Sequence, residues 1–250
     1  MKKVFYAALA LMVMASSCED DAPTPAPVTK GDLVWKNTLM NYGSVVDLND
    51  DQNIPNTNWL RVEAMRYYIS RIEFMNANSQ WVTASEVEYF SQETGKNMVT
   101  LSLPTGSYTK AKAIIGLDSE LNGTDPNTVN IDHPLSSSKA MYWSWALKYK
   151  FLVLEGKTNI DHSGTPTDIL LNYHPGDDAL GYTREWDVDV TIGSVVDTLS
   201  MDIELASIFN GPGGMVDFYT ENSTHMSDSS QYKIGEKLLH NFSAAFSVGQ

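Results

Sequence analysis

Two of the six tryptophans of this chain, Trp143 and Trp145, stand one residue apart, directly after Met141 and Tyr142. An indole is large and carries a single N–H donor, so the pair forms an aromatic surface whose polar groups need partners. Such a surface either packs into the core or forms a binding site. The core interpretation is the ordinary one, because Met141, Trp143 and Trp145 alternate with Tyr142 and Ser144, as on a strand with one buried face.

The five histidines could act as metal ligands only if the fold brings distant segments together. They are His133, His162, His174, His225 and His240. His174 follows an expected strand, and His225 lies in a polar loop beside the thioether of Met226. Imidazole with sulfur or aromatic neighbours suits copper better than calcium or magnesium. Two loop histidines are also common on ordinary protein surfaces, so that alternative stays open.

Other familiar chemistry finds little support in the sequence. The short motifs of common hydrolases and of nucleotide-binding proteins are missing. The acidic segment 47–53 has neither the glycine nor the glutamate that a calcium-binding loop requires, so we expect a solvated turn. The carboxylates Asp118, Glu120, Asp125 and Asp132 crowd one loop, but no nucleophile, base and orienting group can be assigned together. We therefore expect a protein that is not an enzyme.

Residues 1–17 are typical of a bacterial lipoprotein signal. Lys2 and Lys3 precede an apolar run that is too short to span a bilayer, and small residues stand directly before Cys18, the single cysteine. This predicts that Cys18 is lipidated and anchors the mature protein to the outer membrane, facing the periplasm or the cell surface. An unpaired cysteine near an ordinary cleavage site is the alternative.

Charge and length narrow the remaining possibilities. The formal net charge of −14 at pH 7 argues against nucleic acid or anionic lipid headgroups as partners, since both attract cationic surfaces. The lipid on Cys18 is then the expected link to the membrane. Residues 18–31 form an acidic and proline-rich tether, and residues 32–250 are long enough for a single domain with a sizeable core.

The pattern after residue 32 predicts an all-β protein, an antiparallel β-sandwich with a short C-terminal helix. Short apolar and β-branched runs alternate with turn residues. Ile234, Leu238 and Leu239 fall at helical spacing after Ser229, which predicts the helix. Residues 59–65 fit either a helix or a strand. We expect strands over residues 32–37, 44–48, 66–75, 86–91, 97–103, 108–117, 147–155, 167–173, 183–192, 195–205 and 214–219.

Several short motifs occur in the same order as in one known family. Residues 141–156 resemble its Met-Tyr-Trp-x-Trp signature, which continues to a tyrosine and a Glu-Gly pair. Further resemblances lie at Arg66–Ile72, Pro104–Tyr108, Ile115–Ser119, Tyr173-His174, His225 and Asn241–Val248. Over residues 32–248 the chain thus resembles the MbnP-like family, exported bacterial copper-binding proteins related to the methanobactin-associated protein.

This resemblance implies a copper site of unusual composition. In better-studied relatives, histidines hold copper beside a tryptophan that a partner di-haem peroxidase has opened to kynurenine, whose carbonyl and aromatic amine can bind the metal. Carried over to this chain, the implied metal ligands are His174, His225 and either Trp143 or Trp145. One departure is Asn37, which stands near the place where some relatives have a histidine.

Two functions therefore remain in competition. The first is a lipid-anchored extracytoplasmic copper-binding protein for metal capture or relay, with a site built from histidine and an oxidised tryptophan. The second is a surface lipoprotein that binds glycan or another protein through Trp143, Trp145 and Tyr142, because aromatic faces stack on sugars and dominate interfaces. Indoles buried next to His174 would favour copper.

Overall fold

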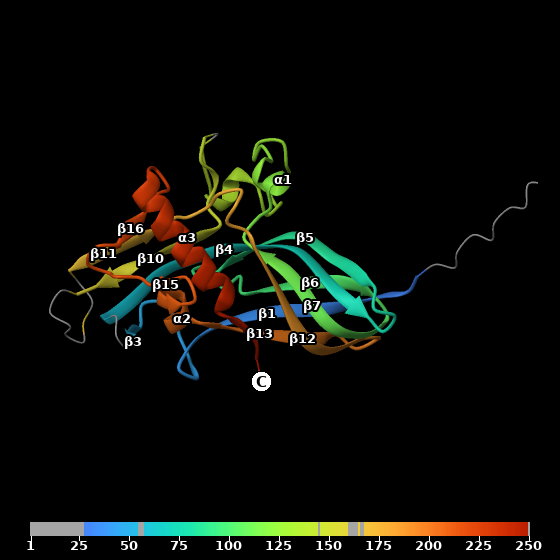
Figure 1. Ribbon diagram of the computed structural model, residues 1–250. Coiled ribbons are helices and arrows are strands. Elements are labelled where there is room, and N and C mark those ends of the chain that lie inside the picture. Colours follow the sequence, from blue (N-terminus) through green and yellow to red (C-terminus); the bar gives the residue numbers. More distant parts are fainter. Residues whose placement is uncertain (1–27, 55–57, 145, 160–164, 166–167, 250) are drawn as a thin grey trace, which may run out of the picture.

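The computed structural model describes residues 28–54, 58–144, 146–159, 165 and 168–249. The predicted signal, Cys18 and most of the tether lie outside the described residues. Figure 1 shows a mostly β protein in which two sheets pack together and a C-terminal helix, α3 (Ser229–Ala244), lies against them. The predicted sandwich with its C-terminal helix is confirmed.

The first sheet is built around β1 (Lys30–Asn41), with β13 (Asp197–Glu204) on one side of it and β6 (Met98–Pro104) on the other. The short strands β2 (Ser44–Val45) and β17 (Phe246–Val248) extend this sheet. Buried and more exposed residues alternate along β1, which is the period of a strand with one face in the core. β1 and β13 run parallel, so the sheet is mixed and not purely antiparallel.

The second sheet is built around β4 (Asn58–Asn76), whose length lets each half pair with different strands. Its first half pairs with β3 (Asp51–Ile54) and β10 (Leu152–Thr158), and its second half with β5 (Trp81–Ser91) and β7 (Gly106–Ile115). β12 (Tyr182–Ile192) borders β7, while β11 (Ile169–Tyr173) and β16 (Ser223–Thr224) continue beyond β10. Residues 59–65 are therefore strand.

Aromatic side chains from both sheets fill the space between them. Trp35 of β1 is fully buried and meets Phe74 of β4 edge to face, with ring centroids 6.3 Å apart. Phe242 of α3 contacts the ring of Tyr67 at 5.3 Å. Burying such large apolar surfaces supplies the main stabilisation of a fold that has a single cysteine.

Smaller elements complete the chain. Two short hairpins form, one from β8 (Tyr142–Ser144) and β9 (Lys148–Tyr149) and one from β14 (Asn210–Gly211) and β15 (Gly214–Met215). The helices α1 (Ser119–Asn122) and α2 (Leu205–Phe209) and the 3-10 turn Ser137–Lys139 are also short. The strand expected over 214–219 was too long, because only 214–215 pair. Among the residues that the structure describes, no helix is long and apolar enough to cross a membrane.

Candidate metal centre

Two parallel strands bring His174 and His225 together. β11 and β16 pair with Tyr173 opposite Thr224. His174 directly follows Tyr173, and His225 directly follows Thr224. The backbone N–H of His174 donates to the carbonyl of Thr224 at 2.9 Å, which carries the pairing one residue further. The two imidazole centroids lie 5.2 Å apart. The fold thus joins two histidines that are 51 positions apart in the sequence.

Trp143 completes a three-ring cluster with them. Its ring centroid lies 5.6 Å from that of His174 and 5.1 Å from that of His225. Trp143 stands where the register of the β8–β9 hairpin shifts, and its side chain is 44% exposed. Met141, two residues earlier, is fully buried. The core interpretation of the aromatic segment therefore holds for Met141 but not for Trp143.

A close backbone contact fixes His174 relative to the aromatic segment. The turn that follows His174 accepts a hydrogen bond at the Pro175 carbonyl from the N–H of Phe151, at 2.7 Å. Gly176 packs so tightly here that a Cβ atom would overlap the carbonyl oxygen of Tyr149. The glycine therefore lets the histidine-bearing turn lie directly on the strand that leads away from Trp143.

Helix α3 holds the other histidine in place. The backbone N–H of His225 donates to Oε1 of Gln231 at 2.8 Å, and the Thr224 hydroxyl donates to the Gln231 carbonyl at 2.7 Å. Gly235 faces the thioether of Met226, and a Cβ at this position would overlap the sulfur. The start of α3 thus determines where the 224–226 segment lies.

The surroundings of His174 leave one of its ring nitrogens available. Nε2 lies 2.6 Å from Oε1 of Glu155, and the side chain is 11% exposed. Burial lowers the pKa of His174 below its ordinary value, although Glu155 acts in the opposite direction. The neutral form of the imidazole is therefore favoured at pH 7. Its Nδ1 atom is buried and makes no hydrogen bond.

The space between the three rings has room for an ion but is too small for a sugar. It measures about 10 Å³, and Trp143, His174, His225 and Met226 line it with Lys150 and Tyr149. With a metal–nitrogen distance of about 2.1 Å, two imidazoles on one ion have centroids roughly 4.5–6 Å apart. The observed 5.2 Å falls within this range. These residues therefore fit a single metal ion.

A positive charge lies at the edge of this cluster. The ammonium of Lys150 stands 5.1 Å from the centroid of the Trp143 ring, within the distance of a cation–π contact. Burial lowers the pKa of Lys150, with Arg66 acting in the same direction and Glu155 against it. Nothing in the sequence pattern indicated this contact, since it depends on how the hairpin folds back.

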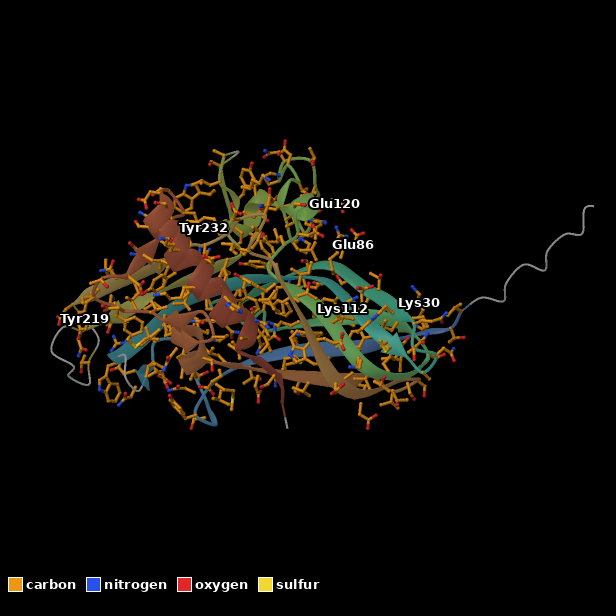
Figure 2. The ribbon with its side chains drawn as sticks, in the orientation of Figure 1. Lys30, Glu86, Lys112, Glu120, Tyr219 and Tyr232 are labelled. Atoms are coloured by element: carbon orange, nitrogen blue, oxygen red, sulfur yellow. The ribbon has the colours of Figure 1, made fainter. Side chains whose placement is uncertain are left out.

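A larger hollow lies elsewhere on the molecule. It measures about 410 Å³ and is lined by residues of β4, β5, β7 and β12, including Glu86 and Lys112, which are labelled in Figure 2. Two of its charged side chains pair with each other, since Nζ of Lys112 lies 2.7 Å from Oε2 of Glu73. It shares no lining residue with the three-ring cluster.

The remaining candidates from the sequence add no described residue to the cluster. Trp145 and His162 lie outside the described residues. His133 accepts a hydrogen bond from the N–H of Leu135, and His240 stacks on Tyr182 with ring centroids 5.1 Å apart. Asn37 is fully buried and bonds to Trp35 and Tyr67, so it does not line the candidate site.

The acidic segments have structural partners. Asp51 pairs with Arg61 at 2.7 Å, and Asp118 and Glu120 both pair with Arg71 at 2.6 Å. Over residues 28–54, 58–144, 146–159, 165 and 168–249, no three His, Cys, Asp or Glu side chains gather as a metal site. Within the described ranges, a further ligand to a metal held by His174 and His225 would therefore come from another type of residue.

The family model for MbnP matches residues 34–227, which include Trp143, His174 and His225. The chain belongs to the MbnP family. MbnP from Methylosinus trichosporium has the same fold, with a TM-score of 0.54 over 89% of this chain and 99% of that chain. The two are 14% identical, so this likeness shows the fold alone. No functionally curated protein matches the chain significantly.

Proposed function

We propose that this MbnP family member is an extracytoplasmic copper-binding protein that captures or relays the metal and has no catalytic activity of its own. The observation that carries the proposal is the convergence of His174, His225 and Trp143 around an ion-sized space. Three segments far apart in the sequence supply these rings, and none of the three residues belongs to the hydrophobic core cluster.

The chemistry of the available donors favours copper over harder cations. A neutral imidazole with a bare nitrogen offers a lone pair, and imidazole nitrogen is a good ligand for copper. Met226 adds a soft sulfur to the lining of the same space, whereas no carboxylate lines it. Calcium and magnesium prefer oxygen ligands, carboxylates above all, and no carboxylate lines this space.

Trp143 is the indole that we assign to the site, because it lies against both imidazoles while remaining 44% exposed. That exposure leaves it accessible to a partner such as a di-haem peroxidase. Conversion to kynurenine would place a carbonyl and an aromatic amine beside the imidazoles as further ligands. Peptide mapping by mass spectrometry of protein from its native host tests this, and modification at Trp145 instead would contradict it.

Copper titration tests the proposed function itself. We expect the purified protein to bind one equivalent of Cu(I) or Cu(II) more tightly than micromolar, because two preformed imidazoles face one space. Replacing both ligands, His174→Ala with His225→Ala, should abolish stoichiometric binding, while His240→Ala, which alters a histidine stacked on Tyr182, should not. Unchanged binding in the double variant would refute the site.

The exposed part of Trp143 supports one competing function, binding of a glycan or a protein. Against it, the ring of Tyr142 is engaged by Tyr149, with centroids 4.9 Å apart, so it adds little to an open aromatic face. A glycan array that responds to the protein and loses its response in Trp143→Ala, combined with no copper binding, would establish this alternative.

We further propose that Cys18 carries the lipid anchor and that the protein resides at the outer membrane. The single cysteine behind a short apolar segment supports this. Fractionation of cells that express Cys18→Ser tests it: the variant should move from the membrane fraction to the soluble extracytoplasmic fraction.

A further inference from the structure

The two ring nitrogens of His174 have different surroundings. Nε2 lies 2.6 Å from Oε1 of Glu155, whereas Nδ1 is buried and has no hydrogen-bond partner. We infer that Glu155 is a positioning residue that holds the proton of His174 on Nε2 and so presents Nδ1 as the metal-binding nitrogen. This inference rests on the proposed function of the site and assigns a role to a residue outside the ligand set.

The tautomer follows from hydrogen-bonding chemistry. An ionised carboxylate can only accept, and a neutral imidazole has one donating and one accepting nitrogen. The contact with Glu155 therefore requires the proton on Nε2, which leaves a lone pair on Nδ1. A buried acceptor without a partner costs free energy, so its persistence in the fold points to a ligand that satisfies it.

The sheet fixes Glu155 in the position that this role requires. β10 pairs antiparallel with β11, and Glu155 stands opposite Asn172. His174 is two residues further along the chain, which makes Glu155 and His174 diagonal neighbours on one face of the sheet. Gly156 lets β10 approach β4 closely, because a Cβ there would overlap the carbonyl oxygen of Arg61. Glu155 thus sits on a strand that is held on both sides.

Glu155 orients the imidazole without joining the ligand set. The lone pair of Nδ1 points to a different side of the ring from the N–H of Nε2, so a carboxylate bound at Nε2 does not reach the same ion. Glu155 does not line the small space between the three rings. Outer partners of this kind typically change metal affinity by about 10- to 100-fold when they are removed.

The test measures the tautomer and the metal affinity separately. The ¹⁵N chemical shifts of the His174 ring nitrogens in the copper-free protein report which nitrogen carries the proton, and a Cu(I) titration reports affinity. Glu155→Ala removes the acceptor, whereas Glu155→Gln keeps a carbonyl oxygen that can still accept from Nε2. Glu73→Ala is the matched control, because Glu73 is also a partly buried strand carboxylate, paired with Lys112.

We expect the wild-type protein, Glu155→Gln and Glu73→Ala to carry the proton on Nε2. Glu155→Ala should lose this preference and bind Cu(I) about 10- to 100-fold more weakly. A wild-type proton on Nδ1, or an unchanged tautomer in Glu155→Ala, would overturn the inference. If the tautomer depends on Glu155 but the wild-type protein binds no copper, the positioning role of Glu155 stands and the proposed function fails.

Discussion

At the scale of single residues, the candidate site depends on an imidazole that is buried yet uncharged. Burial lowers the pKa of His174, and this outweighs the opposite effect of the Glu155 carboxylate. A protonated imidazole carries a proton on each nitrogen and has no lone pair for a metal, so the lowered pKa favours the form in which Nδ1 can bind. The same environment makes the stability of the copper-free protein depend on pH.

We expect the free energy of unfolding to fall as the pH drops below 6.5, the ordinary pKa of a histidine. In that range the unfolded chain binds a proton at His174 that the folded protein does not, so acid favours the unfolded state. Above pH 6.5, His174 is neutral in both the folded and the unfolded protein, so its contribution to the free energy of unfolding is constant. As the pH falls, this contribution decreases until the pH is below the lowered pKa of the folded state. Urea unfolding at a series of pH values measures it. His174→Gln should show a smaller slope, and an equal slope would contradict this account.

The sequence identified the three rings of this cluster but not their arrangement. Trp143 and His225 stood out by residue type and neighbours, and His174 by its place after a strand. Glu155 and Lys150 were missed as functional residues, although Glu155 belongs to the Glu-Gly pair of the aromatic signature. Their roles depend on contacts across strands, which spacing along the chain does not reveal.

At the scale of elements, close backbone packing holds the histidine-bearing turn on the aromatic segment. Gly176→Ala should therefore destabilise the protein by about 1–3 kcal/mol, because the added methyl group must displace the Tyr149 carbonyl or the turn itself. It should also weaken copper binding, since His174 moves with the turn. Thermal unfolding and a copper titration measure the two effects.

The matched control for this prediction is Gly193→Ala. A Cβ at Gly193 meets no heavy atom within 4 Å, so this variant should unfold like the wild type. If Gly176→Ala proved as stable as Gly193→Ala and bound copper equally well, the contact between the turn and the hairpin would have no role in positioning the site.

Elements that are long and have regularly spaced apolar residues could be predicted from the sequence, whereas very short ones could not. A regular spacing of apolar residues along the sequence predicted the strands over 97–103 and 183–192 and the C-terminal helix. Strand β16 has only two residues, and its parallel pairing with β11 leaves no local signal. That pairing aligns His174 with His225, so the decisive contact of the site could not be predicted from periodicity.

At the scale of the whole molecule, the fold brings together chemistry that no single segment contains. The indole comes from a short hairpin, one imidazole from the end of a strand beside the core, and the other from the loop before α3. Their shared location would give a chain without a local metal-binding motif the copper site that we propose. The net charge of −14 adds a general attraction for cations without selecting copper.

In the copper-loaded protein that we propose, one copper ion lies between His174, His225 and Trp143. An anomalous-difference map from crystals of the copper-loaded protein, recorded at the copper absorption edge, tests it most directly. We expect one strong peak within coordinating distance of Nδ1 of His174 and of a ring nitrogen of His225, beside Trp143. A peak at His133 or His240 instead, or no peak among the three rings of a protein that binds copper in solution, would contradict it.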